Sequence, residues 1–329
     1  GENVNYRKTT TWYDGSRIDD AKTDGNIYKK IQDNYYVDTR FLFEKTINLS
    51  MFNLDFQKAL NFVNGKGEIK LIINRTINLQ GNSFVIPKNL ILEFSPNAKI
   101  QHGIIDLGGC KLVDTYQQIF ENCEISGNFY DYKGRAEWFG AKNDLSNDCL
   151  SAFNQVVKIA NKIILSGKYK FSDTWEIIDK QGYSIEGEFN QNITFSEDKD
   201  EFKILLDFDS VPKDRDGLRI NGFVGVTLKD FAVSYYRGEV GGTSLTSNSA
   251  IRLFKGHDFK ISGLRINATH WDATAGLILG NNTGELCAFL GFIEDVKVLC
   301  HVQSIGIGTF GGNTSLNFRS CYVAGGGYW

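Results

Sequence analysis

The sequence predicts a mainly β fold, a right-handed parallel β-helix with helix-capped coils and a small N-terminal β module. The 329-residue chain is rich in Gly (34), Phe (24) and Tyr (14) and poor in Pro (3), which is typical of many short strands joined by tight turns. A six-residue strand template recurs in its C-terminal half, and a helix followed by a strand occurs twice before it. Supersecondary units repeated at a loose period indicate a stacked architecture.

Residues 1–45 are expected to form a small N-terminal module of β-hairpins. Turns at Gly15 and Gly25 separate short aromatic segments, such as 34–37 and 41–43. The segment has too few apolar residues for a core of its own, so it is expected to pack on a partner chain or a larger assembly. An extended tail is the alternative interpretation.

Residues 46–135 are expected to form a first helix-capped short β segment. Asn53 is a plausible helix N-cap and Gly65 a plausible C′ residue. The apolar face of the helix is predicted to comprise Phe56, Ala59, Leu60 and Val63. The strands that follow are predicted at 69–73, 77–79, 84–86, 90–94, 104–105 and 120–125.

Residues 136–329 are expected to form a second helix-capped β-helix, incomplete at its C-terminus. Residues 143–148 offer N-cap candidates, and apolar residues recur at helical spacing over 150–160. A strand at 163–165 follows, and this helix and strand repeat the first pair roughly 92 residues later. The chain stops shortly after the last template copy, so a fragment of a longer protein is expected.

The strand template has the pattern apolar, polar, turn residue, apolar, variable, apolar. Its copies occupy Leu228–Val233, Ile261–Ile266, Ile293–Val298 and Phe318–Val323, and Phe120–Ile125 fits it before the second helix. Starting points about 25 to 33 residues apart predict one copy per coil, with loops of variable length between copies. One coil buries too few apolar side chains to offset its chain entropy, so the coils are expected to be stable only as a stack. The helix at 150–160 is expected to cover the open end of that stack.

Composition excludes several classes of function. A net charge of −3 argues against a nucleic-acid partner, because phosphate binding requires concentrated Lys and Arg. No apolar run approaches the roughly 20 residues that span a bilayer. Residues 1–17 lack the apolar centre of a signal peptide. The six cysteines form no Cys-x-x-Cys pair and have no histidine at zinc-site spacing, so buried free thiols are predicted, with no metal site and no cofactor.

The segment that follows residue 136 resembles the opening segment of pectate-lyase-like β-helix domains. The resemblance is carried by Glu137–Asp144, by the helix and strand that follow, and by Gly167–Tyr169. The sequence departs from the family pattern at Asn143 and Leu145, which replace two glycines, and at Cys149, which stands near the second aspartate. The resemblance implies the β-helix fold.

The front of the chain resembles the lead-in segments of bacteriophage tail fibres and tailspikes. The matching stretches are Trp12–Gly15, Asp19–Lys22, Asp24–Gly25 and Ile27–Lys29. This resemblance implies a homotrimeric spike on the virion tail, attached to other tail proteins through residues 1–45. It also implies binding of host cell-surface polysaccharide, which many members of the family cleave.

Two hypotheses of function follow. The first is a structural and adhesive spike that binds host glycans. The second is a polysaccharide depolymerase, a glycoside hydrolase or lyase, acting on host capsule or surface polysaccharide. Ordinary secreted enzymes share the fold, but they are expected to begin with a signal peptide. The sequence favours the spike and leaves enzymatic activity open.

No diagnostic catalytic motif is present, but outward-facing carboxylates are candidates for catalysis. The second position of the template faces outward, which makes Glu294 a candidate, with Asp272 and Glu285 in the loops beside it. Glycoside hydrolysis requires two carboxyl groups roughly 5–10 Å apart. A solvated surface acid is the alternative interpretation of each.

The loop at 267–272 contains the candidate glycan contacts. Trp271 is a candidate stacking platform and His270 a polar neighbour, because sugar-binding surfaces need ring faces beside hydrogen-bonding groups. A packed loop or a trimer contact is the alternative. Glu137 and Trp138 belong to the helix-cap stretch and are expected to be architectural.

Overall fold

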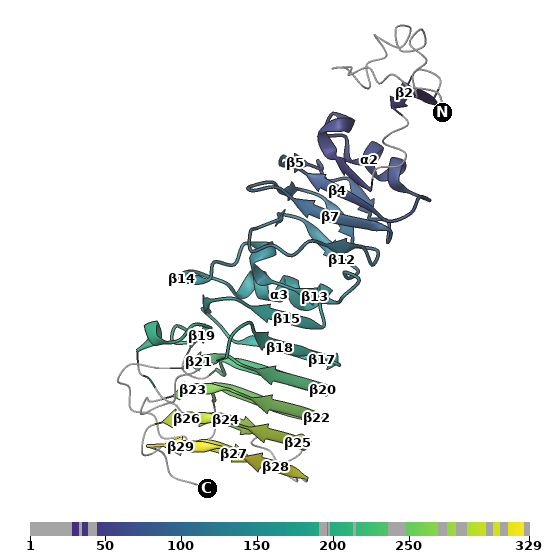
Figure 1. The fold of residues 1–329 in the computed structure, drawn as a ribbon. Helices are drawn as coiled ribbons and strands as arrows, with labels where there is room; N and C mark the ends of the chain where they lie inside the picture. The colour runs from purple at the N-terminus through teal and green to yellow at the C-terminus, as the bar shows by residue number, and fades with distance from the viewer. Residues whose placement is uncertain are drawn as a thin grey trace. The chain divides into compact units, whose positions relative to one another are not determined.

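The protein is mainly β, with most of its strands in parallel sheets (Figure 1). The computed structural model describes residues 28–32, 35–38, 45–190, 196, 198–212, 215–235, 248–268, 275–280, 288–300, 305–309 and 315–325. The chain divides into two compact units, Gly1–Asp131 and Tyr132–Trp329. None of the helices in these residues is both long enough and apolar enough to span a membrane.

In the first unit, parallel strands form three sheets, with strand orders β10-β7-β4-β3, β11-β8-β5 and β12-β9-β6. Their bounds are β3 (Thr46–Asn48), β4 (Ile69–Ile73), β5 (Ile77–Asn78), β6 (Ser83–Val85), β7 (Leu90–Phe94), β8 (Ile100–Gln101), β9 (Ile104–Asp106), β10 (Lys111–Leu112), β11 (Phe120–Glu121) and β12 (Glu124–Ser126). An antiparallel pair, β1 (Tyr28–Gln32) and β2 (Tyr35–Asp38), lies in the region expected to form the N-terminal module. The rest of that region lies outside the described residues.

The helix α2 (Phe56–Val63) buries the four predicted apolar residues. The expected N-cap, Asn53, is wrong. Asn53 has a φ of 53° and ends the 3-10 helix η2 (Leu49–Phe52), so the α-helix begins after it. Asp55 caps α2 instead, because its carboxylate accepts the Lys58 amide at 2.9 Å. Gly65 has the left-handed φ of 72° expected just past a helix end.

In the second unit, the described strands form a larger and a smaller parallel sheet. The larger sheet contains β13 (Lys133–Gly134), β15 (Lys162–Leu165), β17 (Trp175–Gln181), β18 (Ser184–Gly187), β20 (Leu218–Lys229), β22 (Ile251–Ser262), β24 (Ala275–Leu279), β25 (Ala288–Glu294), β27 (Ile305–Thr309) and β28 (Leu316–Arg319). The smaller sheet contains β14 (Asp144–Asp148), β16 (Lys168–Lys170), β19 (Leu205–Asp207), β21 (Ala232–Ser234), β23 (Arg265–Ala268), β26 (Lys297–Cys300) and β29 (Tyr322–Ala324). Figure 1 shows the strands of the larger sheet stacked one above another from β15 to β28.

The predicted template copies lie directly beside one another. Leu228 pairs with Ile261, Ile261 with Ile293, and Ile293 with Phe318, across β20, β22, β25 and β28. The apolar template positions of the first three copies are buried. The turn positions have left-handed φ values of 59°, 67°, 49° and 52° at Asp230, Gly263, Asp295 and Ser320. The chain therefore leaves the larger sheet and enters the smaller one at a kink that recurs in each copy.

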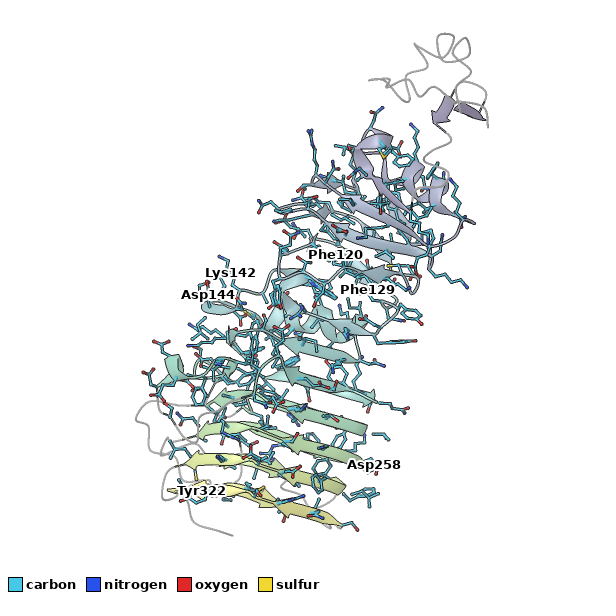
Figure 2. The ribbon with its side chains drawn as sticks, viewed as in Figure 1. Phe120, Phe129, Lys142, Asp144, Asp258 and Tyr322 are labelled. Atoms are coloured by element: carbon cyan, nitrogen blue, oxygen red, sulfur yellow. The ribbon has the colours of Figure 1, made fainter. Side chains whose placement is uncertain are left out.

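The helix α3 (Leu150–Ile159) covers an aromatic cluster in the second unit. Its buried Phe153 packs edge-on against Tyr169, Phe171 and Trp175, with ring centroids 5.0, 5.0 and 4.7 Å away. The N-cap expected within residues 143–148 is wrong, because Asp144–Asp148 form β14 and Cys149 precedes the helix. Figure 2 shows how densely side chains fill both units.

The described cysteines are free thiols, as predicted. Cys110, Cys149 and Cys300 are buried, and Cys123 and Cys321 are half-buried. The remaining cysteine, Cys287, lies outside the described residues.

Candidate functional site

One of the five predicted site residues falls within the described structure. Glu294 ends β25, where it pairs in register with Ser262 and Arg319. Its Oε1 lies 3.6 Å from Nε of Arg319, so the carboxylate belongs to an ion pair on the outer face of the larger sheet. The other four, Asp272, Glu285, Trp271 and His270, lie outside the described residues. The described residues contain no group of three or more His, Cys, Asp or Glu side chains that could hold a metal ion.

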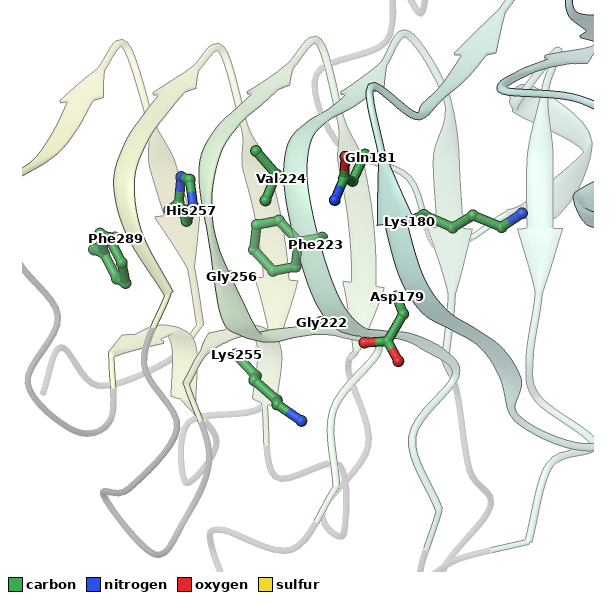
Figure 3. Close-up of a pocket in the computed structure, with 10 residues that line it drawn as sticks. All are labelled: Asp179, Lys180, Gln181, Gly222, Phe223, Val224, Lys255, Gly256, His257 and Phe289. Carbon is green, nitrogen blue, oxygen red and sulfur yellow. The ribbon is translucent and has the colours of Figure 1, made fainter.

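The structure places a groove of about 680 Å³ elsewhere, across four adjacent strands of the larger sheet (Figure 3). The strands are β17, β20, β22 and β25, and we call this feature the β17–β25 groove. Its lining residues are Asp179, Lys180, Gln181, Gly222, Phe223, Val224, Lys255, Gly256, His257 and Phe289. Four of them form one register row: Gln181 pairs with Val224, Val224 with His257, and His257 with Phe289. With strands about 4.8 Å apart, that row extends about 14 Å across the sheet.

Two rows of kinks shape the groove. The first row comprises Asp179, Gly222 and Lys255, with left-handed φ values of 51°, 70° and 57°. The second row comprises Gly182, Gly225, Asp258 and Leu290, at 58°, 71°, 57° and 55°. On β20 each kink places two outward-facing residues in succession, where a regular strand alternates. The strands therefore bend twice in register, and the residues between the two bends line the groove.

Phe223 and Gly256, which line the groove, form an aromatic ring packed over a glycine, and a second pair of this kind lies next to them. A Cβ on Gly256 would lie 2.5 Å from the ring of Phe223, which belongs to the preceding strand. A Cβ on Gly291 would lie 2.1 Å from the ring of Phe259 in the same way. The two rings meet edge to face at 5.9 Å. Glycine at these positions is what lets each ring lie flat against the next strand.

One wall of the groove is a stacked ring pair. The rings of His257 and Phe289 lie 5.3 Å apart with an interplanar angle of 21°. His257 Nδ1 is 2.8 Å from Oδ2 of Asp258, which holds the imidazole in place. Phe289 is 37% exposed, so an apolar ring face stays open to a ligand beside a polar nitrogen.

The charged residues of the groove differ in their surroundings. Lys180 donates to the carbonyl of Val157 at 2.8 Å, and burial lowers the pKa of its ammonium. Asp179 lies against Gly222, where a Cβ would come within 2.1 Å of its carboxylate. Lys255 is exposed and belongs to the first row of kinks, two residues before His257 on β22. Ring faces beside hydrogen-bonding groups suit a ligand that has both apolar faces and hydroxyls.

Glu137 is buried, and its surroundings are those of an architectural residue. It is 3% exposed, and its Oε1 accepts hydrogen bonds from the hydroxyls of Tyr169, at 2.7 Å, and Ser166. Burial and the negative charge of Glu137 raise the pKa of Tyr169 well above its ordinary value. These contacts connect the helix-cap stretch to the turn at residue 166 and to β16, away from the groove.

Asp207, the last residue of β19, and Asp209, in the turn after it, form a carboxylate pair that contacts a lysine. The Nζ atom of Lys199 lies 2.7 Å from Asp207 and 2.5 Å from Asp209. Burial lowers the pKa of Lys199, but its hydrogen bonds to both carboxylates outweigh burial and raise it. Since the ammonium lies between the two acids, they secure η4 (Lys199–Glu201) to β19 and are not available as a catalytic pair.

Comparison of the chain with models of protein families, with curated proteins and with solved structures finds no match. The interpretation of the β17–β25 groove therefore depends on its own residues. Sequence reasoning missed these residues because it looked for carboxylates and loop aromatics. The available signal was the interruption of strand alternation at Asn221–Gly225 and Lys255–Asp258, which apolar periodicity alone does not reveal.

Proposed function

We propose that this chain is part of a bacteriophage tailspike or tail fibre that binds host surface glycans in the β17–β25 groove. The proposal includes a right-handed parallel β-helix as its fold, attachment to the virion tail through residues 1–45, and a homotrimeric assembly. The observation that carries the binding proposal is the exposed His257–Phe289 ring stack in an open groove that crosses stacked parallel strands.

The register of the sheets supports the β-helix. The template copies pair in sequence order across the larger sheet, and Val233, Ile266, Val298 and Val323 pair in the same order across the smaller one. A chain that alternates between two parallel sheets, always adding the next strand at the same edge, winds as a solenoid. The right hand is the one that connections between parallel strands favour.

The groove supports glycan binding through its shape and its side chains. It crosses several strands, so it presents a row of contacts to an extended ligand. The ring of Phe289 offers an apolar face, while Gln181, His257 and Lys255 offer hydrogen-bonding groups beside it. A sugar ring has apolar faces edged by hydroxyls, and this combination matches both.

A binding assay with a matched pair of variants tests the proposal. The chain is applied to a panel of immobilised bacterial surface polysaccharides, and retention on one of them is expected. Phe289→Ala is expected to weaken that binding about tenfold, since an exposed aromatic anchor is lost. Phe189→Ala is the control, because Phe189 is 54% exposed but does not line the groove.

Two results would overturn the proposal. One is the absence of binding to every polysaccharide in the panel. The other is binding that Phe289→Ala leaves unchanged. The trimer is tested separately by light scattering of the purified chain, where three times the chain mass is expected and a stable monomer contradicts it.

A further inference from the structure

We infer that the β17–β25 groove selects anionic glycans over neutral ones, an inference that rests on the glycan binding proposed above. The evidence centres on β22, which carries three basic side chains besides the buried Arg252. Lys255 and His257 line the groove. Lys260 is exposed on the same strand, beyond the kink at Asp258. The two lysines therefore flank the His257–Phe289 stack on opposite sides along the strand.

These two lysines differ from four other basic residues on the larger sheet, which lie in ion pairs. Lys162, Arg219, Lys229 and Arg319 each have a carboxylate partner, respectively Glu186 at 2.5 Å, Glu176 at 3.4 Å, Asp230 at 3.4 Å and Glu294 at 3.6 Å. Within the described parts of the chain, Lys255 and Lys260 form no ion pair. Their positive charges are thus available to a ligand.

Aromatic rings on the next strand accompany two of the basic side chains. His257 stacks on Phe289, and the ammonium of Lys260 lies 5.8 Å from the ring centroid of Phe292. In each pair, the basic residue on β22 lies directly opposite the aromatic residue on β25. A ring face stabilises a cation without neutralising it, so the rings orient the basic groups and leave their charge in place.

The acidic residues nearby do not cancel these charges. Asp258 is bonded to His257 Nδ1, and Asp179 lies against Gly222 on the first row of kinks. Lys255 and Lys260 therefore remain exposed charges that no carboxylate contacts within the described residues, in a chain whose net charge is −3. Exposed lysines of this kind attract anionic ligands and give no comparable attraction to a neutral sugar.

The ligand chemistry that fits is a polymer with regularly placed negative charges. A lysine ammonium is a point charge that binds a carboxylate or a phosphate equally well, whereas bidentate recognition would call for arginine. Two sources supply such charges: uronic acids, which carry carboxylates, and polyol phosphates, which carry phosphodiesters. The experiment distinguishes them.

Three immobilised polymers test the inference with the full chain: polygalacturonate, poly(glycerol phosphate) and neutral dextran. Binding is expected to one or both anionic polymers and not to dextran. That binding is expected to weaken about tenfold or more when salt rises from about 0.05 M to about 0.5 M, because screening removes attraction between exposed charges. Whichever anionic polymer binds more tightly identifies the source of the charge.

Charge-neutralising variants locate the effect. Lys255→Gln with Lys260→Gln is expected to weaken binding to the anionic polymer about 5- to 20-fold and to flatten its salt dependence. The control is Lys88→Gln with Lys203→Gln, which makes the same change in charge at two exposed lysines outside the groove. The control is expected to bind within about twofold of the unmodified chain.

The failure of this inference is distinguishable from failure of the proposed function. Suppose that dextran binds as tightly as the anionic polymers and that Phe289→Ala abolishes this binding. The groove then binds glycans without selecting for charge, which contradicts this inference and leaves the proposed function in place. The same holds if the double lysine variant binds like its control. If no polymer binds, and no polysaccharide of the broader panel does, both proposals fall together.

Discussion

The phenyl ring of Phe223 lies over the Cα of Gly256 on the adjacent strand, so closely that a Cβ on Gly256 would come within 2.5 Å of the ring. Phe259 and Gly291 repeat this relationship between β22 and β25. The first of these pairs lines the β17–β25 groove, and in neither pair can the glycine gain a side chain without displacing the ring.

A methyl group at this contact is expected to destabilise the protein. Gly256→Ala forces the ring and the backbone carbonyl of Phe223 away from β22 and should lower the free energy of unfolding by about 1–3 kcal/mol. Urea denaturation followed by tryptophan fluorescence measures the change. Gly67→Ala is the control, because nothing lies within 4 Å of a Cβ at that position. Equal losses in both variants would contradict the packing described for Gly256.

The second row of kinks predicts an unusual order of stability at Leu290. Leu290 has a φ of 55° and is 48% exposed, and the left-handed conformation costs a residue with a Cβ about 1–2 kcal/mol. Leu290→Gly should therefore be more stable than Leu290→Ala by about 1 kcal/mol. Comparing these two variants cancels the loss of the leucine side chain, and chemical denaturation supplies the measurement.

The opposite order is expected at Thr227, which lies in an extended part of β20. There Thr227→Gly should be less stable than Thr227→Ala by about 0.5–1 kcal/mol. The same order at both positions would show that Leu290 does not carry backbone strain.

Tyr169 predicts loss of stability at alkaline pH. Burial and the charge of Glu137 raise the pKa of Tyr169 in the folded protein, whereas the unfolded chain ionises tyrosine near pH 10. Above about pH 10 the unfolded state therefore binds fewer protons than the folded state, and the free energy of unfolding falls as pH rises. Below about pH 10, Tyr169 makes its full contribution to the free energy of unfolding.

Tyr169→Phe isolates this contribution. The variant should be less stable than the unmodified chain near pH 8, because Glu137 loses a buried hydrogen bond worth about 1–3 kcal/mol. Between about pH 8 and pH 11, the free energy of unfolding of the variant should fall less than that of the unmodified chain. Parallel curves for the two proteins over that range would contradict the assignment.

The buried thiols predict slow alkylation in the folded protein. Burial raises the pKa of Cys110 to about 12 and that of Cys300 to about 11, so almost no thiolate exists near pH 8. Iodoacetamide followed by peptide mass spectrometry should label Cys110 only after urea unfolds the chain. Labelling of Cys110 at similar rates with and without urea would show that its site opens readily.

Much of the architecture could be predicted because it depends on periodic burial. The template copies were found by their apolar positions, and those positions are what the strand register brings together, as Leu228 and Ile261 illustrate. The helix faces were predictable for the same reason. The helix starts were not, because the local backbone at Asn53 decides the cap and its left-handed φ leaves no signal in the pattern of apolar residues.

The groove could not be predicted because its residues are brought together by register alone. Gln181, Val224, His257 and Phe289 have unrelated side chains, and only the pairing of four strands places them in one row. The kinks that shape it occur at aspartates and glycines, which also occupy ordinary turns, and at Lys255 and Leu290, which are not turn residues. Of the candidates chosen from the sequence, Glu294 lies in an ion pair with Arg319, and the loop residues lie outside the described structure.

The packing of each ring over a glycine of the next strand has a consequence for protein engineering. Exchanging β22 alone with a strand from another protein would break two such contacts at once, one with β20 and one with β25. Exchanging β20, β22 and β25 together would preserve both contacts. New packing would then be needed only at the two edges of the exchanged segment. Changing what the groove recognises is therefore best attempted through Gln181, Val224, His257 and Phe289, whose side chains vary independently of those contacts.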